Sequence, residues 1–275
     1  SSSGRRVPLD LHTLPVADFP RPAWQFLLRR FRPDPSLPAP DLLIGAGHRT
    51  HWPMLATRRV FGGRIVVLMR PSLPLSWFDH VAVPEHDRPP DRSNLIVTCG
   101  VLNPLQPAAD PEPGHGLFLV GGPSKHHAWD NASILAQIRA VLEAKPEMYW
   151  TLTTSRRTPD SFLGQLRARS DQRLTVVPVE ATGEGWVAQQ LSRCAQVWVS
   201  EDSVSMIYEA LTAGAKVGLL SVPARRKRSR VVGAVASLKA AGYVIRFGET
   251  TDSKEEDRPR LAESERVADW LLSRS

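Results

Sequence analysis

Two serines and a glutamate near the middle of the second half could together bind a nucleotide. Ser203 and Ser205 open a predicted helix that follows the short apolar run at residues 197–199, with Asp202 just before them. The first turn of a helix offers unpaired backbone N–H groups and the positive end of the helix dipole, which together suit a phosphate. Glu209 lies four residues after Ser205 on the same helix face, where its carboxylate could accept hydrogen bonds from ribose hydroxyls. The segment therefore predicts a site for a nucleoside diphosphate.

A simpler interpretation of this segment stays open. Ser203 is a residue type typical of helix N-caps, with Glu201 and Asp202 beside it, and Glu209 also suits a solvated helix position. Gly214 ends the predicted helix, and a second apolar run follows at once, which makes a strand–helix–strand unit. Such units connect parallel strands, and parallel sheets bind ligands beyond the carboxyl ends of their strands.

Two further loops follow apolar runs and carry residues suited to anions. A glycine pair after residues 117–120 would let backbone N–H groups approach a phosphate, with Lys125 adding a positive charge. The spacing of a P-loop is absent. Arginines after residues 149–154 could fork onto phosphate, although a plain turn and two solvated arginines are the alternatives. The donor-binding candidates in these loops are Gly121, Gly122, Ser124, Lys125, Thr154, Ser155, Arg156 and Arg157.

The strongest concentration of positive charge is the run at residues 225–230, with five basic side chains in six residues. Lys227 and Arg230 are the anion-binding candidates in it, and a solvated basic loop is the alternative. His126 and His127 are neighbours and do not converge as an i,i+4 pair of ligands would, so no metal site is expected. No G-x-G-x-x-G follows a strand, which disfavours a dinucleotide oxidoreductase.

The elements that position these residues alternate between strand and helix in both halves of the chain. This pattern predicts an α/β fold with two Rossmann-like domains facing across a cleft. Pro, Gly and Ala dominate residues 106–116, which we expect to be a linker between an N-terminal domain at 1–105 and a C-terminal domain at 117–258. A terminal helix within 259–275 is expected to pack back on the first domain. We also expect a strand at 7–11, and a helix at 185–194 that contains Cys194.

Composition limits the class of protein. The chain has 275 residues, two cysteines and a net charge of +7, with a pI near 9.9. Two cysteines are typical of a reducing compartment, and no apolar run approaches the roughly 20 residues needed to span a bilayer. We expect a cytoplasmic protein with anionic partners. Residues 23–32 fit a basic amphipathic helix, which predicts contact with the inner face of an anionic membrane or simply a domain helix. Nucleic acid is not expected, because no aromatic residues interleave the basic run.

Several motifs together resemble one family. The run from Ser200 to Met206 with Glu209 and Gly214 resembles the donor-binding helix of GT-B glycosyltransferases, and most closely the mitochondrial fission ELM1-like family. The same family pattern appears at residues 44–47, 78–79, 84–87, 98–103, 121–129 and 154–159. Gly185, Trp186 and Val187 depart from it, since the family often has Asn-Pro-Tyr there. Because the family begins earlier, the first domain is expected to lack its initial strand, loop and helix.

The resemblance implies a metal-independent glycosyltransferase that uses a nucleotide-sugar as substrate and needs no cofactor. The C-terminal domain would bind the donor, and the sugar would pass to a glycan or lipid-linked acceptor at the cleft. The donor residues implied on the predicted helix are Asp202, Ser203, Ser205, Met206 and Glu209. An inverting reaction needs a general base, for which the first domain offers Glu85, His48 and Asp87. The alternative is a non-catalytic peripheral-membrane adaptor with a vestigial nucleotide pocket.

Overall fold

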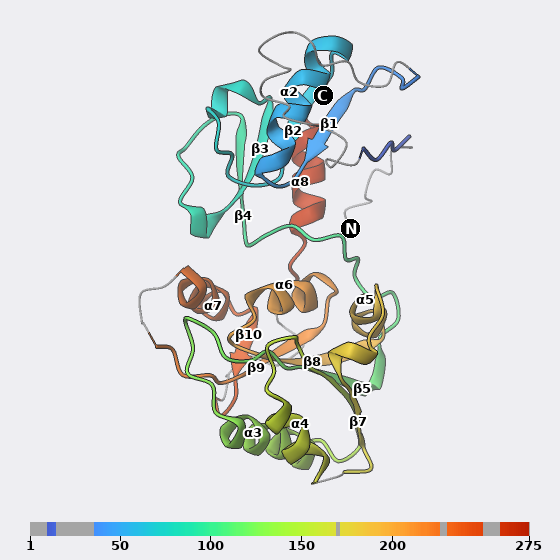
Figure 1. Ribbon diagram of the computed structural model, residues 1–275, viewed down its shortest axis with the longest axis vertical. Coiled ribbons are helices and arrows are strands. Elements are labelled where there is room, and N and C mark those ends of the chain that lie inside the picture. Colours follow the sequence, from blue (N-terminus) through green and yellow to red (C-terminus); the bar gives the residue numbers. More distant parts are fainter. Residues whose placement is uncertain (1–9, 15–35, 169–170, 226–229, 250–258, 275) are drawn as a thin grey trace. The chain divides into compact units, whose positions relative to one another are not determined.

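The computed structural model describes residues 10–14, 36–168, 171–225, 230–249 and 259–274. The chain divides into two compact units, each built around its own sheet (Figure 1). Unit 1 comprises Ser1–Leu102 and Glu263–Ser275, and unit 2 comprises Asn103–Ala262. Every strand pair in both sheets is parallel. The prediction of an α/β fold with two parallel sheets is therefore confirmed.

Unit 1 has a four-stranded sheet in the order β1-β2-β3-β4. Its strands are β1 (Leu42–Gly45), β2 (Arg64–Val67), β3 (His80–Pro84) and β4 (Leu95–Thr98), and its helices are α2 (His51–Phe61) and α8 (Glu263–Leu272). Short 3-10 turns follow β1 at His48–Thr50 and β3 at Glu85–Asp87, and a third precedes β3 at Leu75–Trp77.

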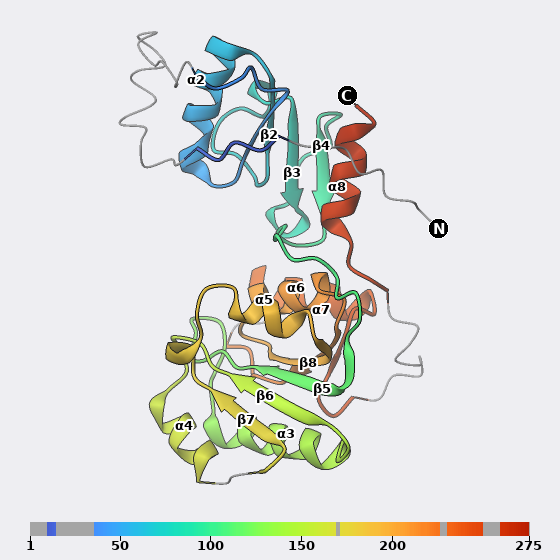
Figure 2. The same cartoon turned by 90° about the vertical axis from the view of Figure 1, so that its right-hand side faces the viewer.

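The two helices of unit 1 cover opposite faces of its sheet (Figure 2). Successive strand residues point to opposite faces, so Ile65 and Val67 pack with Met54 of α2. Ala82 and Ile96 pack instead with Val267 of α8. Burial of such aliphatic side chains stabilises the unit by about 1.5 to 3 kcal/mol each.

Unit 2 has a six-stranded sheet in the order β10-β9-β8-β5-β6-β7. Its strands are β5 (Glu112–Leu119), β6 (Tyr149–Thr153), β7 (Leu174–Val177), β8 (Cys194–Ser200), β9 (Lys216–Leu220) and β10 (Val244–Arg246). Its helices are α3 (Asn131–Ala144), α4 (Asp160–Arg167), α5 (Trp186–Leu191), α6 (Val204–Thr212) and α7 (Arg230–Ala240), with a 3-10 turn at Val179–Ala181. Figure 1 shows α3 and α4 on one side of this sheet and α5, α6 and α7 on the other.

The main core of unit 2 lies between the sheet and α3. Trp150 and Phe118 are fully buried there with their rings 4.7 Å apart, and α3 adds Ile134 and Ile138. The helix begins where predicted because Asp130 caps it, accepting hydrogen bonds from the backbone N–H groups of its second and third residues. This packing holds the carboxyl ends of the central strands in fixed positions.

Four sequence predictions about elements need correction or fall outside the described residues. Cys194 opens β8 and does not lie in a helix, because α5 ends at Leu191 and Cys194 pairs in register with Glu112 of β5. That pairing also places residues 112–116, which the composition assigned to a linker, inside a strand. The predicted strand at 7–11 and helix at 23–32 lie mostly or wholly outside the described residues, and residues 10 and 11 are not in a strand.

Candidate functional site

The candidate nucleotide site of unit 2 is built from loops that follow three neighbouring strands. β8, β5 and β6 lie side by side in the sheet, and strands in a sheet are about 4.8 Å apart. Their carboxyl ends deliver Asp202, Gly121 and Thr154 to one edge. The strand order therefore brings together the three loops for which the sequence predicted nucleotide binding.

An ion pair joins all three loops. Asp202, whose side chain is fully buried, accepts a hydrogen bond from the Gly122 backbone N–H at 3.0 Å through Oδ2. The same oxygen lies 2.9 Å from Nη2 of Arg157, whose side chain is 42% exposed. Arg157 also donates through Nη1 to the carbonyl oxygens of Gly122 and Pro123, at 3.0 and 3.2 Å. Arg157 thus holds the glycine loop in place, and because both of its terminal nitrogens already donate to protein oxygens, few of its N–H groups remain for a ligand.

The glycine pair is needed for close packing. A Cβ on Gly121 would lie 2.2 Å from Oδ2 of Asp202, and one on Gly122 would lie 2.2 Å from the Arg157 carbonyl oxygen. The Gly121 N–H donates to the Ser200 hydroxyl at 2.7 Å. Both glycine N–H groups, expected from the sequence to face a phosphate, therefore donate to protein oxygens in this structure.

Hydroxyl groups complete the network around this loop. Thr158 donates to the carbonyl oxygens of Val120 and Gly121, and Ser155 accepts from the backbone N–H of Arg157. Thr154 accepts from the N–H of Val179. Ser124 accepts from two backbone N–H groups within its own loop, those of His126 and His127. The predicted donor residues Ser124, Thr154 and Ser155 are therefore engaged in holding loop geometry.

The free charges lie outside this network. Lys125 and Arg156 are exposed, and neither makes an ion pair or side-chain hydrogen bond with the residues that the structure describes. An open hollow of about 580 Å³ lies beside Lys125. It is lined by Pro123, Ser124, Lys125, Arg157 and Asp202. Its volume falls in the range of roughly 300 to 1,000 Å³ that small-molecule sites occupy.

The first turn of α6 stands at the same sheet edge. Ser203 is its N-cap residue, but the Ser203 side chain makes no capping hydrogen bond to the helix. The predicted N-cap position at Ser203 is therefore confirmed, whereas the neighbouring carboxylates of Glu201 and Asp202 are buried and accept hydrogen bonds from other loops. Ser205 is exposed, and Met206 and Glu209 are partly buried. Burial raises the pKa of the Glu209 carboxyl above its ordinary value.

The catalytic candidates of unit 1 are not brought together in the same way. His48 follows β1, whereas Glu85 and Asp87 follow β3, two strands or about 10 Å away. His48 and Glu85 are exposed, and the Asp87 carbonyl oxygen accepts from Arg70 at 2.6 Å. His48 instead lies edge-on to His51, with ring centroids 5.6 Å apart.

His51 is a functional candidate that the sequence reasoning missed. It is fully buried at the start of α2, and burial, with a further contribution from the charge of His48, lowers its pKa. Lys227 lies outside the described residues, as does the side chain of Arg230. Within the described ranges no three His, Cys, Asp or Glu residues gather as metal ligands.

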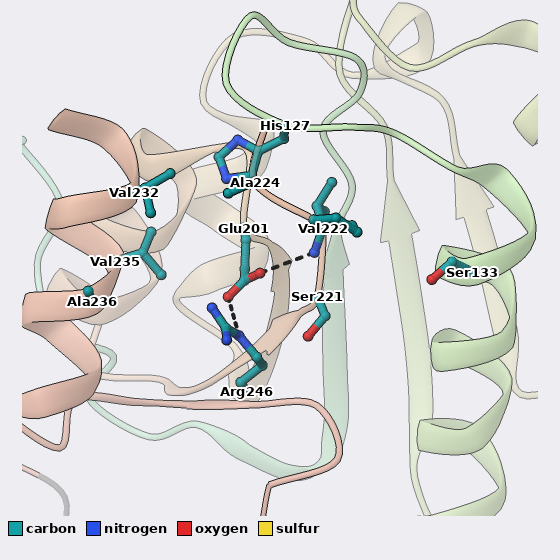
Figure 3. A pocket seen from close by; sticks show the side chains of 11 residues that line it. His127, Ser133, Glu201, Ser221, Val222, Ala224, Val232, Val235, Ala236 and Arg246 are labelled. Atoms are coloured by element: carbon teal, nitrogen blue, oxygen red, sulfur yellow. Dashed lines mark hydrogen bonds and ion pairs between the residues drawn. The ribbon is translucent and has the colours of Figure 1, made fainter. Parts of the chain in front are cut away.

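Sequence reasoning also missed a second pocket of unit 2, of about 330 Å³ (Figure 3). Glu201 and Arg246 form an ion pair within its lining at 2.6 Å, and His127 stands above them in Figure 3. The sequence could have indicated Glu201, since it is a carboxylate that directly precedes Asp202 at the end of a predicted strand. Arg246 carried no local signal, because its partner lies 45 residues earlier in the chain.

A family model described as "Mitochondrial fission ELM1" matches residues 6–275. The chain belongs to the mitochondrial fission ELM1 family. No curated protein matches this ELM1-family chain.

Solved structures identify the fold of this ELM1-family protein. UDP-GlcNAc 2-epimerase from Methanocaldococcus jannaschii matches with a TM-score of 0.53 and 10% identity, covering 85% of this chain and 77% of that one. MurG from Acinetobacter baumannii matches with a TM-score of 0.42 and 15% identity, covering 92% and 67%. At these identities the likeness concerns the fold alone. The fold is that of two Rossmann-like domains of the GT-B type, as the sequence predicted.

In the part of the chain that the structure describes, no helix combines the length and the apolar character that crossing a bilayer requires.

Proposed function

We propose that this ELM1-family protein is a glycosyltransferase whose unit 2 binds a nucleotide-sugar donor. One observation carries the proposal: the loops after β8, β5 and β6 meet at the uncapped first turn of α6, and two of these loops carry the exposed cations Lys125 and Arg156. A phosphate at this place would gain the backbone N–H groups of the helix and its dipole without a metal ion. This is also the edge at which parallel α/β sheets bind their ligands.

The roles follow from what each side chain can still do. Lys125 and Arg156 would neutralise the diphosphate, which is the leaving group when the sugar is transferred. Ser203 and Ser205 would donate hydroxyl hydrogen bonds to phosphate oxygens at the helix N-terminus. Glu209, one turn further on, would accept from the ribose hydroxyls. The Arg157–Asp202 pair would keep the loops in place and need not touch the donor.

The proposal for the acceptor names its class, the unit that binds it and three candidates for the general base. We propose that unit 1 binds a glycan or lipid-linked acceptor, and that Glu85, His48 or Asp87 removes the proton from its hydroxyl. The exposure of His48 and Glu85 at the carboxyl edge of the unit 1 sheet supports a role in contact with a substrate. His51 behind His48 would orient it through their edge contact.

Thermal shift with UDP-, GDP-, ADP- and CMP-sugars tests the donor part. A ligand at 100 times its Kd stabilises the folded protein by about 2.7 kcal/mol, so a matching nucleotide-sugar raises the Tm by several degrees. Arg156→Ala should weaken this stabilisation, and Arg167→Ala, an exposed arginine on α4, should leave it unchanged. Release of the nucleoside diphosphate with candidate acceptors then measures transfer. A protein that no member of the panel stabilises would contradict the proposal.

A non-catalytic adaptor is the second candidate, and one observation favours it. Both N–H groups of the glycine pair are already bonded to Ser200 and Asp202, as expected if the pocket has lost its ligand. An adaptor would bind none of the four nucleotide-sugar classes. It would instead bind vesicles of anionic lipid, a property that flotation with the full chain measures directly.

A further inference from the structure

The pocket around Glu201 and Arg246 is separate from the hollow at the glycine loop but shares a wall with it. Glu201 lines the pocket and the next residue, Asp202, lines the hollow. Likewise His127 lines the pocket and Ser124 the hollow, with His127 Nδ1 and Ser124 Oγ 3.5 Å apart. A ligand whose phosphates lie in the hollow can therefore extend a neighbouring group into the pocket.

The polar side of the pocket is fixed in place. The Glu201 side chain is 5% exposed, and its two oxygens accept from the Val222 N–H at 3.1 Å and from Arg246 Nε at 2.6 Å (Figure 3). Each carboxylate oxygen has two lone pairs, so both can accept a further hydrogen bond. Arg246 donates to Glu201 through Nε only. Its terminal nitrogens, with four N–H donors, make no hydrogen bond to the described residues.

The rim of the pocket is equally well held. The loop that carries His127 is joined to the segment after β9 by two backbone hydrogen bonds of 2.7 Å, from Ala128 to Pro223 and from Arg225 to His126. Burial lowers the pKa of His127, which favours the neutral ring over the charged one. The Gln137 side chain exchanges two hydrogen bonds with the backbone of Ser221. The pocket is thus formed before any ligand arrives, which lowers the entropic cost of binding.

The opposite side of the pocket is aliphatic. Val232, Val235 and Ala236 of α7 line it, and Figure 3 shows α7 with these three residues across from the Glu201–Arg246 pair. Ala236 is exposed at the surface of the helix, so the pocket opens beside it. A ligand would therefore meet fixed hydrogen-bonding groups on one side and hydrocarbon on the other.

We infer that this pocket holds the sugar ring of the donor. A volume of about 330 Å³ is at the lower end for ligand sites, so it takes one ring and not a whole nucleotide-sugar. A diphosphate is disfavoured, because the Glu201 carboxylate offsets the charge of Arg246. A base is disfavoured, because among the described residues that line the pocket His127 alone offers an aromatic surface for stacking. A sugar needs fixed donors and acceptors for its hydroxyls and a hydrocarbon surface for its C–H groups, and the pocket supplies both.

The inference rests on the proposed function, and a pocket-filling variant separates the two. Ala236→Trp places an indole in the pocket from an exposed position on α7, so the core is not disturbed. Ser237→Trp is the matched control, since Ser237 is the next residue, is also exposed and does not line the pocket. Calorimetric titration compares UDP-, GDP-, ADP- and CMP-sugars with the same nucleotides lacking the sugar.

The expected result is specific to the sugar. Ala236→Trp should weaken binding of the preferred nucleotide-sugar at least about tenfold and change binding of its sugar-free nucleotide less than about twofold, whereas Ser237→Trp matches the wild type. If Ala236→Trp weakens both ligands equally, or neither, the sugar inference is overturned while the donor proposal stands. If the wild type binds neither the nucleotide-sugars nor the nucleotides, the proposed function fails and the inference fails with it.

Discussion

The loops at the carboxyl ends of the strands differ between the two units in the number of hydrogen bonds and ion pairs that join one loop to the next. In unit 2 the loops come from adjacent strands, and the Arg157–Asp202 pair with the Gly122 N–H joins them. In unit 1 the candidate loops are separated by β2, and the exposed His48 and Glu85 belong to different ones. Hydrogen bonds thus join the strand-end loops of unit 2, whereas unit 1 presents separate side chains at one sheet edge. Loops held in fixed positions favour binding of the proposed donor in unit 2. Separate exposed side chains are compatible with contact between unit 1 and acceptors of varied structure.

The largest expected effect is at the glycine loop of unit 2. Gly122→Ala should lower the free energy of unfolding by about 3 kcal/mol, because the added Cβ meets the backbone of Arg157, which cannot move aside easily. A urea titration measures the loss, and hydrogen exchange of β5 and β8 assigns it to unit 2. Gly183→Ala is the control, since its Cβ would contact nothing within 4 Å. Equal stability of the two variants would show that the loop is not tightly held.

The next effect distinguishes two neighbouring arginines. Arg157→Ala should lower the free energy of unfolding by about 1 to 2 kcal/mol, because buried Asp202 loses its partner, although solvent screens the partly exposed guanidinium. Arg156→Ala should change stability by less than about 0.5 kcal/mol and should weaken nucleotide binding. Paired thermal unfolding and nucleotide titration check both. A loss of stability in Arg156→Ala and a loss of binding alone in Arg157→Ala would contradict the roles given to these two arginines.

A smaller effect of opposite sign is expected at Glu209. Burial raises its pKa in the folded state above the unfolded value of about 4.3, so the folded state prefers the protonated carboxyl. The contribution of this group is favourable below pH 4.3 and is lost as the pH rises through the folded pKa. Glu209→Gln should therefore raise the Tm by about 1 to 2 °C at pH 7 and leave it unchanged near pH 4. The same variant should weaken nucleotide binding, and a Tm that falls at pH 7 would contradict the burial.

The smallest stability effect is expected in unit 1. His48→Ala should change the free energy of unfolding by less than about 0.5 kcal/mol, because His48 is exposed. The variant also removes one of the two causes that lower the pKa of His51, the lesser one. NMR titration of His51 should thus show its pKa moving upward toward 6.5. A large loss of stability would mean that the unit 1 loops are held as firmly as those of unit 2.

The sequence predicted the fold class and the loops well and the contacts within the loops poorly. Alternating strands and helices place Gly121, Thr154 and Asp202 at one edge of a parallel sheet, because this placement depends on strand direction and not on side-chain contacts. The pairing of Asp202 with Arg157 could not be predicted, because it joins residues 45 apart that meet only once the strand order is known. Cys194 was assigned to a helix because a short apolar run has no clear period, and pairing with β5 decided its conformation.

The most direct test of the central claim follows the phosphates themselves. Phosphorus NMR of UDP, GDP and ADP titrated with the full chain reports whether a diphosphate binds beside Lys125 and Arg156. We predict that one of the three shows shifted or broadened resonances with the wild type, and that the effect is lost with the Lys125→Ala/Arg156→Ala double variant, which keeps the wild-type Tm. Resonances that stay unchanged for all three nucleotides at saturating protein, or that respond equally to the double variant, would contradict a donor site at this edge of unit 2.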